Sequence, residues 1–297
     1  MSGRPRLFLV DGSSYVYRAF HALPPLTGPG GHPTNATYGF TAMLLKLLRE
    51  QAPEYAGVVF DTEGPTDRHR AFEAYKAQRP PMPEALAVQL PDIHRVVAGF
   101  RLPLLAEPGQ EADDLLGTLA VRAAETGFDV VLVTGDKDMC QVVGPAIRLY
   151  DSMRERWITE AEVRERFGVA PPGVPDVLGL MGDSVDNIPG VPGVGEKTAK
   201  QLIAEFGSLE NLLGSLEGVK RPRLREALAA HAEQARLSRA LATIRTDLPV
   251  PFQPEAFRRL PPDLPALGEL FRALGFTRLL DAISQGELPG LPAGAAP

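Results

Sequence analysis

The sequence predicts an α/β fold in which a mostly parallel central sheet is flanked by helices and followed by a helical region. Short apolar runs rich in β-branched residues, typical of strands buried on both faces, lie in the first half of the chain. Helical patterns separate them, and such alternation indicates a parallel sheet covered on both sides. From about residue 160 onward the pattern is helical, with Gly and Pro punctuation at 171–175 and 189–195.

The individual elements follow from these patterns in chain order. The predicted strands are 6–10 (RLFLV), 57–60 (GVVF), the weaker 102–105 (LPLL) and the clearest one, 129–134 (DVVLVT). The predicted helices between them cover about 36–51, 83–99 and 111–126.

Three regions of the chain are therefore expected. Residues 1–160 form an α/β unit, residues 161–285 a helical unit, and the Pro/Gly/Ala-rich stretch 286–297 a flexible tail or linker. The segment 62–82 interrupts the alternation, because it is charged, has little apolar periodicity and ends in a proline cluster. We expect it to form a protruding loop or mobile helical arch, at about 62–90.

Composition narrows the possible functions. Cys140 is the single cysteine, so an intrachain disulfide and a cysteine-based zinc site are excluded. The five histidines are scattered without paired or helical spacing, which argues against a histidine metal site. No apolar run approaches the ~20 residues of a membrane span, and Leu7–Val10 is too short for a secretion signal. The expected location is the cytoplasm.

The net charge of −6 argues, taken alone, against a nucleic-acid partner. Acidic and basic residues are segregated along the chain, however. If divalent cations neutralise the acidic positions, the local field can invert.

Acidic residues stand at the carboxyl ends of the predicted strands. Asp11 directly follows the run 6–10, Asp61 directly follows 57–60, and Asp136 comes soon after 129–134. Ligands of open parallel sheets bind beyond this edge. Each residue alone has an ordinary explanation as a helix cap or turn residue. That explanation does not account for separate segments bringing carboxylates to one edge.

Further acids extend this group. EADD opens the helix 111–126, where one acid would suit the helix dipole but three neighbours repel each other. TGDKD adds Asp138, and GDSVDN adds an i,i+3 pair that joins the group if it begins a helix facing the same edge. The predicted acidic pool comprises Asp11, Asp61, Glu111, Asp113, Asp114, Asp136, Asp138, Asp183 and Asp186.

Such a pool needs cations to stay ionised, because burial and like charge raise carboxyl pKa values. Oxygen ligands suit Mg²⁺ or Mn²⁺, and the acids are too many for one octahedral ion. We predict two or more ions about 4 Å apart, the geometry of phosphodiester hydrolysis. Glu111 and Asp114 share a helix face while Asp113 points elsewhere, so this triplet could bridge two ions.

The stretch GVPGVGEKT (190–198) resembles a P-loop only superficially. Glu196 stands between Gly195 and Lys197, where that motif needs Lys directly after Gly, and no strand precedes it. We predict instead a helix–hairpin–helix at about 174–207, with helices over 176–188 and 196–207. Glycines there allow close approach to a DNA phosphate, without sequence readout. An ordinary corner between two helices is the alternative.

Basic residues gather in two other places. The arch segment carries Arg68, Arg70, Lys76 and Arg79 beside Tyr75, a combination that suits single-stranded nucleic acid, with a solvated charged loop as the alternative. A second cluster, KRPRLRE (220–226), is equally consistent with backbone contact and with plain surface.

Together these motifs resemble the 5′-nuclease (flap endonuclease) family, and within it the 5′→3′ exonuclease domains of bacterial DNA polymerases. The likeness covers roughly residues 6–285. It rests on the ordered set LVDGSSYVYRAFHAL, TNATYGF, VVFD, YKAQRP, EADDLLGTLA, VTGDKDMCQ and GDSVDNIPGVPGVGEKTA. One departure is the arch entrance, often Thr-Phe-Arg in the family and here Thr66-Asp67-Arg68.

The resemblance implies structure-specific 5′→3′ exonuclease and 5′-flap endonuclease activity on DNA, in primer removal and repair, with a two-metal site. The first ion would be gathered by Asp11, Asp61, Glu111 and Asp113, and the second by Asp114, Asp136, Asp138, Asp183 and Asp186. Lys76 and Arg79 match catalytic arch residues, and Tyr75 matches an aromatic that stacks near the scissile nucleotide. The implied DNA-binding residues are Arg18, Arg68, Arg70, Gly193, Gly195, Lys197, Thr198 and Lys200.

The resemblance also implies cofactors and partners. Two or more Mg²⁺ ions, replaceable by Mn²⁺, are expected, with a K⁺ ion at the helix–hairpin–helix. The expected partners are DNA with 5′ flaps, nicks or 5′ ends and a fused or separate DNA polymerase. The chain is expected to be a monomer near the bacterial nucleoid.

Two alternatives stay open. The chain could be a non-catalytic module that binds DNA junctions, although none of the nine acids is missing. It could also be a PIN-like RNase, against which the helix–hairpin–helix and the basic arch count.

Overall fold

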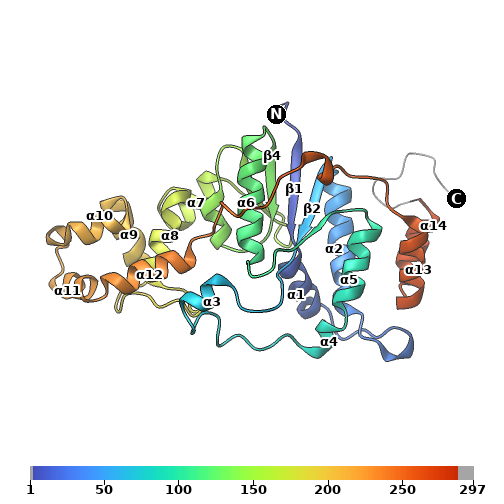
Figure 1. Cartoon of the computed structure of the whole chain (residues 1–297), viewed down its shortest axis with the longest axis horizontal. Helices are drawn as coiled ribbons and strands as arrows, with labels where there is room; N and C mark the ends of the chain where they lie inside the picture. Colours follow the sequence, from blue (N-terminus) through green and yellow to red (C-terminus); the bar gives the residue numbers. More distant parts are fainter. Residues whose placement is uncertain (1–2, 287–297) are drawn as a thin grey trace.

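The computed structural model describes residues 3–286, so the predicted tail lies outside the described residues except for Gly286. A central sheet forms the middle of the molecule (Figure 1). Helices α7–α12, here called the helical lobe (residues 160–242), extend to one side of it, and α13 and α14 lie at the opposite side. The predicted α/β class is confirmed.

The sheet has strand order β3-β2-β1-β4-β5-β6. Its strands are β1 (Arg6–Asp11), β2 (Tyr55–Val59), β3 (Leu104–Leu105), β4 (Asp129–Val133), β5 (Ile147–Asp151) and β6 (Arg156–Ile158). All neighbours are parallel except β5 and β6, which pair antiparallel. The carboxyl ends of β1, β2 and β4 therefore lie side by side.

Each face of the sheet carries its own apolar core, because side chains alternate along a strand. Leu7 and Leu9 of β1 point to the face covered by α6, and their core continues into the helical lobe. Phe8 and Val10 point to the opposite face, where α1, α2 and α5 pack. All four side chains are essentially inaccessible, as expected for a strand buried on both sides.

The helices lie in two groups, one around the sheet and one in the helical lobe. Around the sheet lie α1 (Gly12–Ala22), α2 (Asn35–Gln51), α5 (Leu90–Gly99), α6 (Ala112–Glu125), α13 (Leu264–Leu274) and α14 (Thr277–Ser284). The helical lobe contains α7 (Glu160–Phe167), α8 (Val174–Met181), α9 (Glu196–Phe206), α10 (Leu209–Gly214), α11 (Pro222–Ala230) and α12 (Ala232–Ala242). No helix among residues 3–286 combines the length and apolar character that crossing a membrane requires.

The predicted strands are confirmed with shifted ends, and the prediction missed β5 and β6. Their segments, IRLYD and RWI, are short and carry charged residues, which weakens the apolar pattern, and β6 is the edge strand of the sheet. The helix predicted over 83–99 is wrong in one respect. It is interrupted at Val88 and Gln89, so that a short α4 (Glu84–Ala87) precedes α5.

The arch segment (residues 62–83) runs along one edge of the molecule (Figure 1). It holds one short helix, α3 (Asp67–Ala71), followed by turns over 73–79. Thr66 and His69 form a capping box at the N-terminal end of α3. Asp67, the residue that departs from the family pattern, accepts hydrogen bonds from Arg70 and from Arg245 beyond α12.

The first helix of the predicted helix–hairpin–helix is shorter than expected. α8 ends at Met181, and residues 182–187 form a turn closed by backbone pairing of Asp183 with Ile188. Gly182 explains the stop, since its φ is +72° and a Cβ there would lie 2.5 Å from the Gly190 nitrogen. The prediction that Asp183 and Asp186 begin a helix is therefore wrong.

Candidate active site

Carboxylates from separate segments meet at the carboxyl edge of the sheet. Asp11 ends β1 and caps α1, accepting a hydrogen bond from the Ser14 nitrogen at 2.9 Å. Thr134, directly after β4, donates to Asp11 Oδ2 at 2.8 Å and accepts from the Asp136 nitrogen at 3.1 Å. The loops after β1 and β4 are thus fixed to each other.

The loop after β2 is fixed in the same way to the start of α6. Asp61 Oδ1 accepts a hydrogen bond from the Ala112 nitrogen at 2.8 Å, and the Asp61 nitrogen donates to Ser13 at 2.9 Å. This contact places Asp113, in the first turn of α6, beside the strand ends.

We call Asp11, Asp61, Asp113 and Asp136 the acid quartet. Burial raises the pKa of Asp11 to about 6, although hydrogen bonds from Ser14 and Thr134 oppose the shift, and Asp61 and Asp136 add to it. Burial also raises the pKa of Asp113 well above its ordinary value, and the charges of Asp136, Asp11 and Asp61 contribute. The quartet is therefore one electrostatic unit, as the strand-end positions predict.

A second group of acids adjoins the quartet. Burial raises the pKa of Asp138 to about 7, and Asp136 adds to the shift. Lys137 forms ion pairs with Asp138 and Asp183, bridging the loop after β4 and the turn after α8. The Asp138 Oδ1 atom is buried and makes no hydrogen bond, although the Lys137 ammonium lies 3.4 Å away.

The arch folds onto the remaining acids. Glu111 accepts hydrogen bonds from the Tyr75 hydroxyl at 3.0 Å and from Lys76 Nζ at 2.9 Å. Asp186 pairs with Arg79, lies 3.7 Å from Lys76 Nζ, and accepts from the backbone nitrogen of Lys76 through its carbonyl. Tyr75 is 2% exposed, so its ring lies inside the site and not on the arch surface.

Lys76 is held under strain. Its φ is +54°, a conformation that costs a non-glycine residue roughly 1–3 kcal/mol and that is frequent at functional sites. Burial lowers the pKa of Lys76, but the charges of Glu111 and Asp186 outweigh burial and raise it, so the ammonium stays charged.

Arg68 pairs with two of the predicted metal ligands. Its guanidinium donates to both carboxylate oxygens of Asp114, at 2.6 and 2.7 Å, and to Glu111 at 3.0 Å. Its side chain is 11% exposed, whereas the sequence suggests a DNA contact. Glu111 and Asp114 share a helix face, as predicted, and that face meets Arg68.

The remaining predicted DNA-binding residues occupy varied environments. Arg18 pairs with Asp151, and Lys200 is tied to Glu196 of its own helix. Arg70 is exposed and pairs with Asp67. Gly193, with φ +79°, and Gly195 are exposed at the hairpin before α9, and Lys197 is exposed in the first turn of α9. Thr198 is half-buried on the first turn of α9.

Sequence reasoning missed Thr134 and Lys137, which organise the acids from within the loop after β4. The alternating charges of TGDKD were a signal for Lys137, since a cation between two acids balances their repulsion. It also missed Arg245, whose backbone nitrogen donates to Asp114 at 2.8 Å from a distant part of the chain.

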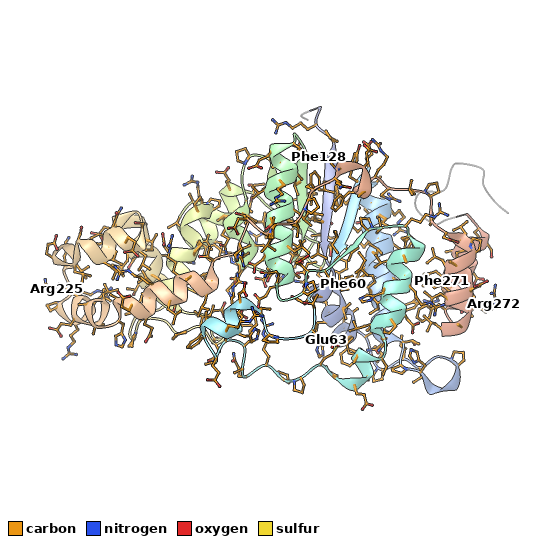
Figure 2. All side chains as sticks on the ribbon, viewed as in Figure 1. Phe60, Glu63, Phe128, Arg225, Phe271 and Arg272 are labelled. Carbon is orange, nitrogen blue, oxygen red and sulfur yellow. The ribbon has the colours of Figure 1, made fainter. Side chains whose placement is uncertain are left out.

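A cavity of about 640 Å³ opens beside the quartet, between α1 and the arch segment. Asp61 and Arg79 border it, and Tyr17, His21 and Phe60 give it an aromatic wall. Phe60 and Glu63 come from the loop that leads from β2 into the arch (Figure 2). Burial lowers the pKa of His94, another lining residue, which favours its neutral form.

The donor set fits divalent cations. All candidate ligands are oxygens, Asp138 presents a buried oxygen without a hydrogen bond, and Asp11, Asp113 and Asp138 have raised pKa values that a bound cation would reverse. Among residues 3–286, no three carboxylate, imidazole or thiol groups converge as a ready-made ligand set. Lys76, Arg68, Arg79 and Lys137 supply the positive charge instead.

Known protein families match the sequence of this chain. The family model described as the 5′-3′ exonuclease N-terminal resolvase-like domain matches residues 6–168, and that of the 5′-3′ exonuclease C-terminal SAM fold matches 169–265. The 5′-3′ exonuclease of Aquifex aeolicus is 40% identical over 94% of this chain and 95% of its own. DNA polymerase I of Bacillus caldotenax is 42% identical over 94% of this chain. This chain spans 32% of that polymerase's length.

Solved structures share the fold. The bacteriophage T5 D15 flap endonuclease, in a pseudo-enzyme-product complex with DNA and metal ions, matches with a TM-score of 0.66 and 20% identity, over 93% of this chain and 95% of that one. The catalytic core of Rad2 in complex with a DNA substrate matches with a TM-score of 0.63 and 18% identity, over 94% and 91%. With both family models spanning its α/β core and helical lobe, the chain belongs to the 5′-3′ exonuclease family.

Proposed function

We propose that this chain is a structure-specific 5′→3′ exonuclease and 5′-flap endonuclease that hydrolyses DNA phosphodiesters with two or more divalent ions. One observation carries the proposal. Four segments bring Asp11, Asp61, Asp113 and Asp136 to a single sheet edge, close enough for Asp61 and Asp136 to raise the pKa of Asp11. Packing alone does not require such a cluster, whereas phosphodiester hydrolysis by paired cations does.

Mg²⁺ is the proposed cofactor, with Mn²⁺ as a substitute, because every candidate ligand is a hard oxygen. Asp11, Asp61, Glu111 and Asp113 would hold one ion, and Asp136, Asp138, Asp183 and Asp186 would serve another, directly or through water. Asp114 was predicted to serve the second ion. Because both of its carboxylate oxygens accept hydrogen bonds from Arg68, we propose instead that Asp114 holds Arg68 in place beside Glu111. Bound ions would supply activated water and offset charge on the reacting phosphate.

Arch residues would handle the substrate. Lys76 and Arg79 now neutralise Glu111 and Asp186. Once cations occupy the site, these side chains would be free to pair with the phosphate that is cut. The Tyr75 hydroxyl orients Glu111 and, at 3.3 Å, contacts Asp186, so its motion would be coupled to theirs.

The DNA would be held at two places. The hairpin and the first turn of α9, with exposed Gly193, Gly195 and Lys197, suit contact with a duplex backbone, and a K⁺ ion there is part of the proposal. The 640 Å³ cavity beside the quartet has room and an aromatic wall for the unpaired 5′ end. Unpairing the terminal nucleotides costs a few kcal/mol.

The relatives suggest the biological setting. DNA polymerase I proteins carry a region similar to this chain, which supports a role in removing primers and in repair, with a fused or separate polymerase as partner. We propose a monomer that acts in the cytoplasm, at the bacterial nucleoid.

A labelled 5′-flap substrate with Mg²⁺ tests the proposal. We expect wild-type protein to cut at the junction, and Asp113→Asn and Lys76→Ala to lower the single-turnover rate by about 100-fold or more. Lys46→Ala, an exposed ammonium paired with Glu155 on the surface, is the matched control and should cut normally. Wild-type rates in both site variants would refute the assignment.

The same assay separates the alternatives. A non-catalytic junction binder would bind the flap and leave it uncut. A PIN-like RNase would cut an RNA hairpin faster than the DNA flap.

A further inference from the structure

The basic cluster between α10 and α11 remains unassigned by the proposed activity. It comprises Lys220, Arg221, Arg223 and Arg225, here called the basic patch, and it lies at the far end of the helical lobe, where Figure 2 labels Arg225. All four side chains are exposed. We propose that the basic patch is a second binding surface for the backbone of duplex DNA, continuous with the hairpin before α9. The inference rests on the proposed function.

The charges of the basic patch are unbalanced. Elsewhere in the lobe, Arg236 pairs with Glu210 and Glu233, Arg239 with Asp176, and Lys200 with Glu196. Within residues 3–286, none of the four patch residues forms an ion pair. Glu205 lines the same cavity as Lys220 and Arg221, and Glu226 directly follows Arg225 in the sequence. The four cations lie within six positions of the chain. They leave a local positive field that a polyanion would neutralise.

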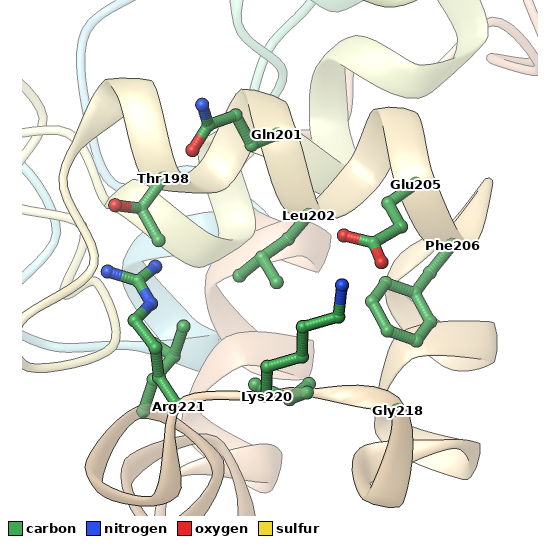
Figure 3. A pocket seen from close by; sticks show the side chains of 10 residues that line it. Thr198, Gln201, Leu202, Glu205, Phe206, Gly218, Lys220 and Arg221 are labelled. Atoms are coloured by element: carbon green, nitrogen blue, oxygen red, sulfur yellow. The ribbon is translucent and has the colours of Figure 1, made fainter.

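A cavity lies between the basic patch and α9. It has a volume of about 360 Å³ and lies between α9 and the segment that leads into α11. Figure 3 shows the Arg221 guanidinium directed toward Thr198, in the first turn of α9, and the Lys220 ammonium directed across the cavity toward Glu205 and Phe206. Thr198 and Arg221 thus bring the basic patch next to the first turn of α9, which directly follows the exposed glycines of the hairpin.

The lining of this cavity favours phosphate over base recognition. Two cations, a hydroxyl and an amide, from Lys220, Arg221, Thr198 and Gln201, are groups that bind backbone phosphate, and they outnumber the one carboxylate in the lining, that of Glu205. Phe206 is its one aromatic residue and is half-buried, so the surface offers no stacking platform for single-stranded bases. A duplex that leaves the hairpin along the lobe would place successive phosphates over this surface.

Changes in the basic patch and changes in the acid quartet are expected to have different effects on the protein. A patch contact adds affinity through counterion release, with a slope of log K against log salt of about 0.9 per phosphate. Loss of two contacts therefore lowers the slope by about 1.8 and leaves the chemistry at the acid quartet unchanged. Affinity is expected to fall only for DNA that is long enough to reach the patch.

The test compares Lys220→Ala/Arg221→Ala with Arg272→Ala/Arg278→Ala. The control pair consists of exposed arginines on α13 and α14, at the opposite end of the molecule, where Figure 2 labels Arg272. Arg221 caps α11 through its backbone alone, so alanine removes no capping bond. Affinity for 5′-flap substrates is measured from 50 to 200 mM salt in Ca²⁺, with duplex arms of about 20 or about 6 base pairs, and cleavage is measured in Mg²⁺.

We expect the patch variant to bind the long-arm substrate about tenfold more weakly at low salt, with the reduced slope, and to bind the short-arm substrate as wild type does. Its single-turnover rate at saturating protein should be unchanged, as should every property of the control. Wild-type affinity and slope for the long arm would overturn the inference, as would an equal loss on both arms. If wild-type protein leaves the flap uncut, the proposed function fails, whereas the binding comparison still decides the patch.

Discussion

The guanidinium of Arg68 and the carboxylate of Asp114 form a bidentate pair, with both N–O distances at or below 2.7 Å and both side chains nearly buried. The same guanidinium donates to the carbonyl oxygens of Leu241 and Thr243, at the end of α12. Arg68 therefore joins three parts of the molecule: the arch, the first turn of α6 and the helical lobe. Its position makes it a structural residue behind Glu111 and Asp114.

Arg68→Ala should destabilise the protein substantially. Removing one partner leaves the Asp114 charge buried and unpaired, at a cost of about 3–5 kcal/mol. Chemical denaturation without metal measures the loss. The matched control is Arg70→Ala, whose exposed pair with Asp67 should contribute less than about 1 kcal/mol. Equal effects of the two changes would contradict the structural role of Arg68.

Asp113→Asn should have opposite effects on stability and activity. Burial and the charges of Asp136, Asp11 and Asp61 raise the pKa of Asp113, so a neutral amide relieves repulsion in the metal-free protein. We expect a melting temperature in EDTA at pH 8 a few degrees higher than that of wild type, together with loss of cleavage. Asp247→Asn, at a carboxylate that is 81% exposed, should change neither property. A lower melting temperature for Asp113→Asn would show that repulsion does not dominate at this position.

The stability of the metal-free protein should fall as pH rises from 5 to 8. The pKa values of Asp11 and Asp138 are raised by burial to about 6 and about 7, so the folded state binds protons more tightly than the unfolded state. Their contribution is complete below the unfolded pKa, near 4, and is lost as pH passes 6 and 7. Scanning calorimetry in EDTA measures it as the difference between wild type and Asp138→Asn at each pH. A difference that does not depend on pH would exclude the titration of Asp138 in this range.

The sequence was most informative where local pattern determines structure. The run 129–134 and the acids after β1, β2 and β4 could be placed because a parallel sheet brings the carboxyl ends of its strands to one edge. The prediction failed where a tertiary contact determines the local structure. The turn at 182–187 follows from the close approach of Gly182 to Gly190, which no periodicity records.

Partners of the acids were harder to predict than the acids themselves. Arg68 and Tyr75 were assigned to DNA from their exposed-looking sequence context, yet both are held inward by Glu111. Arg245 contacts Asp114 from more than a hundred residues away in the chain, and nothing in its neighbourhood marks it. Long-range pairing of this kind depends on the finished fold.

Calorimetric titration of the metal-free protein with Mn²⁺ tests the central claim most directly, that the strand-end acids hold paired divalent cations. We predict about two ions per chain, with affinity that increases from pH 6 to pH 8 as the carboxyl groups deprotonate. Asp136→Asn, which removes one charge from the acid quartet, should weaken or abolish at least one of these ions. No binding to wild type, or binding that Asp136→Asn leaves unchanged, would contradict the account.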